Sequence, residues 1–227
     1  MPTEFRSERK YLCSEGQLRI LEARLRPLMQ PDSHQEREGG YLVRSVYFDD
    51  LDNRFLTENL RGLDDRVKYR IRAYEGRDDV IRLEAKHKVH GMTKKEACPL
   101  TREECDRLLA GERPAFSREL PKPLRMLWVE LQTATVRPRM LVSYTRTAYV
   151  LKSGNVRITF DRDIAATPAY GRLFDHPLPL EPVLPPGQHI LEVKYDELIP
   201  DYLMQVLETG ELMQNPFSKY VMSRLPK

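Results

Sequence analysis

Basic side chains recur at every second position in two neighbouring segments, residues 66–74 and 80–90. Because successive side chains of a β-strand point to opposite faces, each segment predicts a strand with one charged and one apolar face. The charged faces carry Arg66, Lys68, Arg70 and Arg72 in the first segment, and Arg82, Glu84, Lys86 and Lys88 in the second. Like charges opposite each other destabilise a sheet, so the pattern predicts an anionic ligand or interleaved carboxylates between the strands.

The pattern alone has two structural interpretations. A half-exposed sheet with solvated charges, or a structural network of ion pairs, would also place charge on one face of a strand. An enclosed charged face accounts better for several cation-rich strands, because amphipathic helices elsewhere in the chain can cover the apolar faces. We therefore expect an α+β fold, an antiparallel β-barrel that forms a tunnel, with helices packed outside and charges inside.

The other elements fit one such domain, residues 1–227. Ser14 with Gln17, and Thr101 with Glu104, form capping boxes that predict the start of a helix. Further helices are expected at 122–133, 201–213 and 217–224, and residues 51–65 form a bend with a short element. The remaining strands are expected at 4–12, 41–50, 91–100, 137–151, 155–164 and 189–198.

Composition narrows the class of protein. The chain has 227 residues, of which 41% are hydrophobic and 31% charged, and its net charge is only +3, so a basic surface for nucleic acid is not indicated. There is no apolar run near the ~20 residues that a bilayer span needs, and we expect a cytoplasmic protein without signal peptide or membrane anchor. Three cysteines without a CxxC pair argue against a disulfide framework and a zinc site.

The charge pattern points to phosphate chemistry. Arginine binds phosphate oxygens through two parallel hydrogen bonds, and lysine adds a compact charge. A cation at every second strand position gives a spacing of ~6.6–7 Å, which suits successive phosphates of a polyphosphate or a nucleoside triphosphate. Glu84 and Glu192 are then interpreted as ligands of a divalent metal ion that bridges phosphate oxygens. The sequence has no GxxxxGK[ST] motif, so a P-loop is excluded.

Nine short motifs follow one another along nearly the whole chain. They are ERKY (8–11), VRSVYFDD (43–50), VKYRIRAY (67–74), RLEAKHK (82–88), TKK (93–95), SYTRTAY (143–149), VRITFDRD (156–163), LEVKY (191–195) and PFSKY (216–220). In this order they resemble the polyphosphate polymerase (VTC) domain of the triphosphate tunnel metalloenzyme superfamily. Other branches of that superfamily begin with an E-x-E-x-K strand. Here Arg6 takes the place of the first glutamate, which favours the polymerase branch and leaves fewer carboxylates for a metal ion.

The resemblance implies roles for particular residues. The basic residues implied to act on the reacting phosphates are Arg70, Arg72, Lys86, Arg146, Arg157 and Lys219. Those implied to bind the substrate are Lys10, Lys94, Tyr144 and Ser218, with Lys94 chosen over Lys95, Tyr144 either stacking on a base or packing in the barrel, and Ser218 donating to a phosphate. Glu192 is implied to bind Mn²⁺ or Mg²⁺. The positions of Arg66, Lys68, Arg82 and Lys88, inside the tunnel or at its mouths, stay open.

The implied function is a metal-dependent polyphosphate polymerase, a phosphotransferase that moves the γ-phosphoryl group of ATP onto a growing polyphosphate chain. The expected ligands are ATP and inorganic polyphosphate, not nucleic acid, and any coupling to transport requires a membrane-protein partner. Two alternatives remain: hydrolysis of tripolyphosphate or a nucleoside triphosphate, and a non-enzymatic sensor of polyphosphate or inositol polyphosphate. The oligomeric state stays open.

Overall fold

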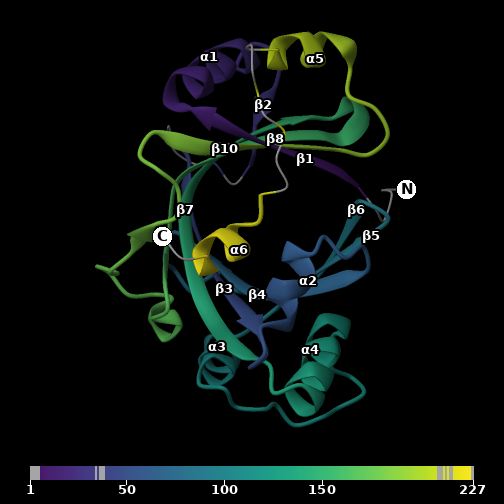
Figure 1. Ribbon diagram of the computed structural model, residues 1–227, viewed down its shortest axis with the longest axis vertical. Helices are drawn as coiled ribbons and strands as arrows, with labels where there is room; N and C mark the ends of the chain where they lie inside the picture. The colour runs from purple at the N-terminus through teal and green to yellow at the C-terminus, as the bar shows by residue number, and fades with distance from the viewer. Residues whose placement is uncertain are drawn as a thin grey trace.

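The computed structural model describes residues 6–33, 35, 39–208, 212, 214 and 217–225. One antiparallel sheet curls around a central space, and helices lie against its outer face (Figure 1). The strands are β1 Ser7–Ser14, β2 Gln30–Pro31, β3 Tyr41–Asp49, β4 Arg66–Tyr74, β5 Arg82–Val89, β6 Met92–Pro99, β7 Arg137–Leu151, β8 Val156–Thr167, β9 Glu181–Pro182 and β10 Gln188–Tyr195. The α-helices are α1 Glu15–Leu25, α2 Arg54–Leu60, α3 Arg102–Leu109, α4 Lys122–Thr133, α5 Asp201–Leu207 and α6 Lys219–Arg224.

The order of the strands brings the two ends of the sheet together. It runs β1-β10-β8-β7-β3-β4-β5-β6, with β2 added beside β7 and β9 beside β8. The first and last strands of this order meet where Arg6 and Thr93 exchange two backbone hydrogen bonds, with N–O distances of 3.0 and 3.1 Å. The expected α+β fold with a curled antiparallel barrel and outer helices is confirmed, and its closure rests on this narrow contact.

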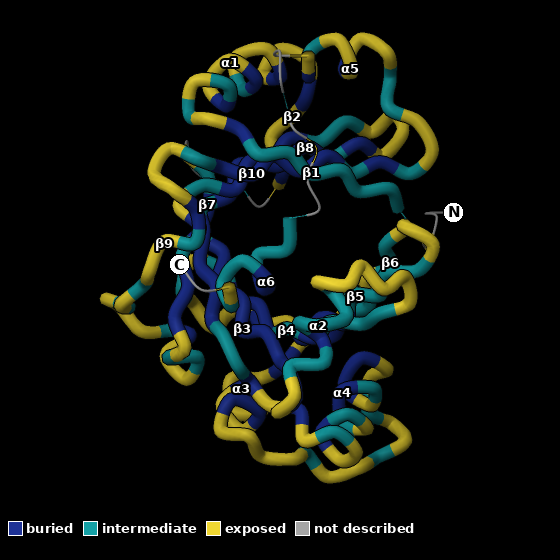
Figure 2. The backbone as a smooth tube through the Cα atoms, viewed as in Figure 1, coloured by how far each residue is buried: buried dark blue, intermediate teal, exposed yellow. Residues whose placement is uncertain are grey.

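Helices cover the outer face of the sheet in two groups. Helices α1 and α5 lie over β1, β10 and β8, whereas at the opposite end of the molecule α4 lies beside β5 and β6 and α3 lies beside β7 (Figure 1). On α1, the leucines at positions 18, 21 and 25 are fully buried against the sheet. On α4, at the other end of the molecule, Leu124, Leu127 and Leu131 are buried in the same way. Both expected capping boxes are present, at Ser14 and Thr101. The most buried residues lie in β3, β7, β8 and β10, whereas β1, β5 and β6 are less buried (Figure 2).

A third group of buried residues fills part of the interior of the curled sheet. It includes Tyr47, Tyr144 and Ile190 from three strands and Tyr220 from α6. Helix α6 lies on the concave side of the sheet instead of outside it (Figure 1). The tunnel thus has one helix of the chain as part of its lining, which the hydrophobic pattern did not predict.

Several element boundaries differ from expectation. Strand β8 extends to Thr167, and β10 ends at Tyr195, where an irregular segment leads to α5. Helix α5 ends at Leu207, and the residues expected to continue it at 209–211 and 213 lie outside the described part of the chain. The bend at 51–65 contains α2, whose N-terminus follows Asn53 in the left-handed conformation (φ 56°). The three cysteines are buried and unpaired with one another, as expected.

Among the described residues, no helix combines the length and apolar composition that crossing a bilayer requires.

Candidate functional site

A central cavity of about 70 Å³ lies inside the curled sheet. Within the described part of the chain, eight basic side chains line it, together with two carboxylates and three hydroxyl groups. The lining residues are Lys10, Lys68, Arg70, Arg72, Lys86, Arg146, Lys194 and Lys219, then Glu8 and Glu192, and then Tyr47, Tyr144 and Ser218. The open volume is small because the long charged side chains reach across the space and pair with one another.

The wall formed by β4 and β5 is organised around Glu84. Arg70 lies directly opposite Glu84 in the strand pairing, and its Nε and Nη2 atoms lie 2.7 and 2.5 Å from the same carboxylate oxygen. Lys95 of β6 approaches the other oxygen at 3.2 Å. Burial raises the pKa of Glu84, but Arg70, Arg72 and Lys95 outweigh it and hold that pKa well below its usual value. Glu84 therefore acts as a buried counterion behind the arginines.

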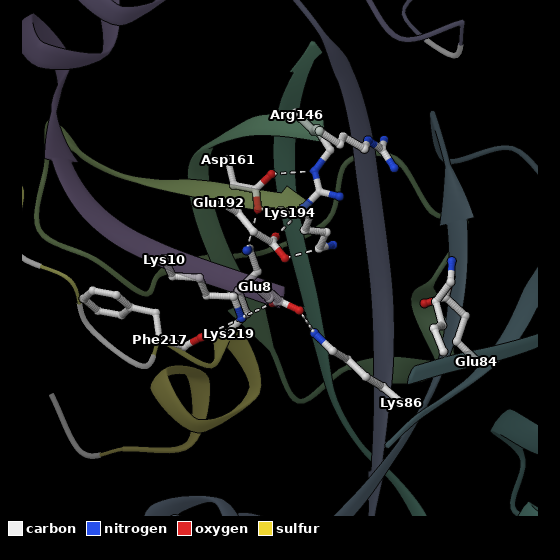
Figure 3. Close-up of polar contacts among 12 residues, drawn as sticks. Glu8, Lys10, Glu84, Lys86, Arg146, Asp161, Glu192, Lys194, Phe217 and Lys219 are labelled. Atoms are coloured by element: carbon white, nitrogen blue, oxygen red, sulfur yellow. Dashed lines mark hydrogen bonds and ion pairs between the residues drawn. The ribbon is translucent and has the colours of Figure 1, made fainter. Parts of the chain in front are cut away.

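The opposite wall, formed by β7, β8 and β10, has a second buried counterion (Figure 3). Asp161 accepts two hydrogen bonds from Arg146, at 2.6 and 2.8 Å, and its second oxygen lies 2.5 Å from the Lys219 ammonium group. Burial raises the pKa of Asp161, but Arg146 and Lys219 lower it to about 2. Arg146 also approaches Glu192 at 3.5 Å, and Lys194 contacts Glu192 at 2.9 Å. Each of these cations already has an internal anionic partner.

Glu8 of β1 lies beside Glu192 and was not predicted as a site residue. The pairing of Lys10 with Glu192 and of Glu8 with Lys194 places the two carboxylates diagonally across β1 and β10. Glu8 binds the ammonium groups of Lys10 at 2.9 Å and Lys86 at 2.6 Å. Burial and Glu192 raise the pKa of Glu8, yet the surrounding lysines lower it to about 2. The available signal was its alternation with Lys10, since both belong to the same face of the strand.

Helix α6 brings its two predicted residues into the cavity. Ser218 caps the helix, and its hydroxyl accepts a hydrogen bond from the Lys68 ammonium group at 3.0 Å. The position of the helix is fixed by Tyr220, whose hydroxyl donates to the buried Asp49 carboxylate at 2.6 Å and whose ring stacks on Tyr47. Asp49 thus has a structural role, because it holds the helix that carries Lys219.

The cavity brings together nine of the eleven predicted site residues. These are Lys10, Arg70, Arg72, Lys86, Tyr144, Arg146, Glu192, Ser218 and Lys219. Lys68, Lys194 and Tyr47 also line it. The sequence had left the position of Lys68 open and had not pointed to Lys194 or Tyr47. Arg66 and Lys88 lie farther out, and Arg82 is exposed.

Two predicted residues lie elsewhere. The choice of Lys94 over Lys95 was wrong for the interior, because Lys94 pairs with His87 on the outer face, whereas Lys95 pairs with Lys86 on the inner face. Arg157 shares the inner face with Lys194, but it binds the Asp32 carboxylate at 2.5 Å and the Tyr41 hydroxyl at 3.2 Å, outside the lining of the central cavity.

Tyr144 is packed inside the barrel, between cations. The residue is 2% exposed, and the Lys219 ammonium group and the Arg146 guanidinium lie 4.8 and 5.2 Å from the centre of its ring. Its hydroxyl accepts a hydrogen bond from Arg72 at 2.9 Å. Cations are attracted to the face of an aromatic ring, so these contacts stabilise the packed position of Tyr144. Base stacking by this ring stays a prediction.

The carboxylates of the cavity fit a divalent metal ion only if the phosphates of a ligand also bind that ion. Among the described residues, no group of three histidine, cysteine or acidic side chains is arranged to hold a metal ion. Mg²⁺ is, however, commonly held by one or two carboxylates together with substrate phosphates. Glu8 and Glu192 supply such a pair on adjacent strands. They could hold an ion that the phosphates of a ligand also bind.

The sequence of the whole folded region matches one family. A sequence model of the VTC domain matches residues 5–225. The chain belongs to the VTC domain family. No protein of curated function gives a significant match to this VTC domain.

Two solved structures share the fold of the VTC domain. A putative adenylate cyclase from Bacillus halodurans is 17% identical, with a TM-score of 0.56 and 96% of each chain covered. A putative adenylyl cyclase from Hippeastrum, described as having a dominant triphosphatase activity, is 14% identical, with a TM-score of 0.53, 91% of this chain covered and 85% of that one. At these identities the likeness concerns the fold.

The buried counterions lead to a first prediction. Asp161→Asn should lower the free energy of unfolding by about 3–5 kcal/mol, because Arg146 and Lys219 lose a fully buried carboxylate. Urea denaturation measures this loss. Added tripolyphosphate should stabilise the variant more than the unmodified protein, since it supplies the missing negative charge. Asp175→Asn, which removes an exposed ion pair with Arg172, is the control and should cost about 1 kcal/mol or less. Equal stability of the two variants would contradict this account of Asp161.

Proposed function

We propose that this VTC domain transfers the γ-phosphoryl group of ATP onto a polyphosphate chain inside the tunnel and releases ADP. The observation that carries the proposal is the central cavity, on which eight cations from five strands and one helix of the described chain converge and whose lining is mainly polar. Phosphoryl transfer asks the protein mainly to position the groups and to stabilise spreading negative charge. A phosphate oxygen of the acceptor is itself the nucleophile, so the proposal needs no general base.

The buried ion pairs explain how the cavity can be stable without a ligand and still bind a polyanion. Glu84 and Asp161 neutralise the arginines of the two walls from behind, while Glu8 and Glu192 lie among the lysines. Phosphate oxygens would become additional partners of the arginines, with Glu84 and Asp161 still behind them, and would take the place of Glu8 and Glu192 as partners of the lysines facing the cavity. Arg70 and Arg72 would hold the chain from one wall, with Arg146 and Lys219 opposite, so that donor and acceptor phosphates lie in line.

Mn²⁺ or Mg²⁺ would be held by Glu192 together with Glu8. When bound, the ion would neutralise charge on the phosphate oxygens. The basic side chains keep their role in binding and aligning the phosphates, and the enclosed cavity limits the access of water.

One observation favours hydrolysis as a second candidate. Arg6 in place of the first glutamate leaves fewer carboxylates for a metal ion, but Glu8 places a second carboxylate beside Glu192. Hydrolysis of tripolyphosphate or of a nucleoside triphosphate would use the same cavity, with water in place of the acceptor phosphate.

Product analysis separates the two reactions. The full chain is incubated with ATP and Mn²⁺, and in parallel with Mg²⁺, and the products are resolved on a polyacrylamide gel stained for polyphosphate, with ADP and free phosphate measured separately. The proposal predicts polyphosphate together with ADP. Free phosphate and ADP without polyphosphate would show hydrolysis instead, and unchanged ATP with both metals would contradict both activities.

A further inference from the structure

A second cavity of about 390 Å³ continues outward from the central one. The two cavities share Glu8, Lys10, Lys68, Lys86 and Ser218 as lining residues. The outer cavity adds Arg66 and Lys88 at the ends of β4 and β5. Lys68 and Ser218 therefore lie where the inner space opens into the outer one.

Two successive pairs of like charges face each other across β4 and β5 at this opening. Arg66 lies opposite Lys88, and Lys68 lies opposite Lys86. Residues two apart on one strand are separated by ~6.6–7 Å, so the four cations form a short double row leading outward. Like charges directly opposite each other destabilise a sheet. The two strands can pair without like charges opposite each other, as the next position inward shows, where Arg70 lies opposite Glu84.

The outer row differs from the central cavity in its counterions. Lys86 binds Glu8, but within the described part of the chain no carboxylate forms an ion pair with Arg66, Lys68 or Lys88. The Lys68 ammonium group contacts the neutral Ser218 hydroxyl instead. Burial, followed by the nearby Lys10 and Lys86, lowers the pKa of Lys68 well below its usual value. The positive charge of Arg66, Lys68 and Lys88 thus has no direct ion pair among the described residues and is offset only at longer range, by Glu8, Glu58 and Asp64, in contrast to the arginines around Glu84 and Asp161.

We propose that the outer cavity is a second phosphate-binding site, in which Lys68, Arg66 and Lys88 hold the part of a linear phosphate chain that extends beyond the central cavity. Lys68 is the residue at the junction and contacts the chain from both spaces. This inference rests on the proposed function in taking a phosphate chain as the ligand. It adds that the phosphate chain passes outward at the end of the tunnel near Arg66 and Lys88. This direction leads away from Arg157, which binds Asp32 and Tyr41.

Calorimetric titration of two ligands tests the outer site. The full chain is titrated without metal with tripolyphosphate and with a longer linear polyphosphate of defined length, first unmodified and then as the double variant Arg66→Gln with Lys88→Met. The variant should lose about tenfold or more in affinity for the longer chain, with a clearly smaller loss for tripolyphosphate. Lys68→Met should weaken the binding of both ligands, because this residue lines both cavities.

The control removes the same number of positive charges from the surface. Arg82→Gln with Lys152→Met changes two exposed side chains that line neither cavity, and the affinity for both ligands should stay as in the unmodified protein. Equal losses for both ligands in the Arg66/Lys88 variant, or no loss for the longer chain, would overturn the outer site. Failure of the unmodified protein to bind either ligand would instead contradict the proposed function itself. Circular dichroism confirms that each variant is folded before it is titrated.

Discussion

Replacing Arg70 and Arg72 together by glutamine should weaken the binding of tripolyphosphate by roughly 100-fold or more. Both side chains line the central cavity, and hydrogen bonds to charged groups contribute about 1.5–3 kcal/mol each, while a factor of ten corresponds to about 1.4 kcal/mol. Polyphosphate synthesis from ATP should fall at least as far, because the same side chains would stabilise the charge that develops in transfer. Calorimetry with tripolyphosphate and a turnover assay measure the two effects.

The variant needs controls because Glu84 would lose its principal partners and be left buried. A triple variant that also carries Glu84→Gln removes this charge and separates a folding defect from a binding defect. Arg82→Gln is the matched control, since Arg82 lies opposite Arg72 on the same face but is exposed and lines no cavity. Unchanged tripolyphosphate affinity in the folded triple variant would be inconsistent with phosphate binding between these walls.

Glu192→Gln should remove turnover while leaving the binding of a phosphate chain intact. Glu192 is buried in the wall of the cavity and would hold the metal ion with Glu8. Loss of such electrostatic stabilisation typically costs about 100-fold or more in rate. In the absence of metal, the variant should bind tripolyphosphate at least as tightly as the unmodified protein, because one negative charge leaves the cavity.

Glutamate 197 provides the control for this change, because it follows the same strand but is exposed, and Glu197→Gln should retain full activity. Metal titrations of both variants complete the comparison, with the Glu192 variant expected to need higher Mn²⁺ for any residual turnover. Full activity of Glu192→Gln at low Mn²⁺ would contradict the role proposed for this carboxylate. Loss of tripolyphosphate binding without metal would show that Glu192 supports the cavity structurally.

The strands of the tunnel could be predicted from the sequence because alternation is a local property. Arg70, Arg72 and Lys86 fall on one face by period two, and the strand pairing then places that face inside. The capping boxes at Ser14 and Thr101 were predictable for the same reason, since each depends on a side chain and a backbone group three residues apart.

What the sequence could not predict depends on register and on contacts between distant segments. The choice between Lys94 and Lys95 depends on which of them pairs with Lys86, and two adjacent lysines give no local sign of it. The counterion role of Asp161 requires Lys219, which is distant in sequence and reaches it only because Tyr220 and Asp49 fix α6 inside the sheet. The packing of Tyr144 could not be predicted for a similar reason, as the cations over its ring come from β7 and from α6.

The most direct test of the tunnel as the phosphate site is a crystal structure of the chain with tripolyphosphate. The account predicts phosphate oxygens in the central cavity, in contact with Arg70 and Arg72 on one wall and Arg146 and Lys219 on the other, while Glu84 and Asp161 stay behind them. Tripolyphosphate bound on the outer surface, with the ion pairs of the central cavity unchanged, would contradict it.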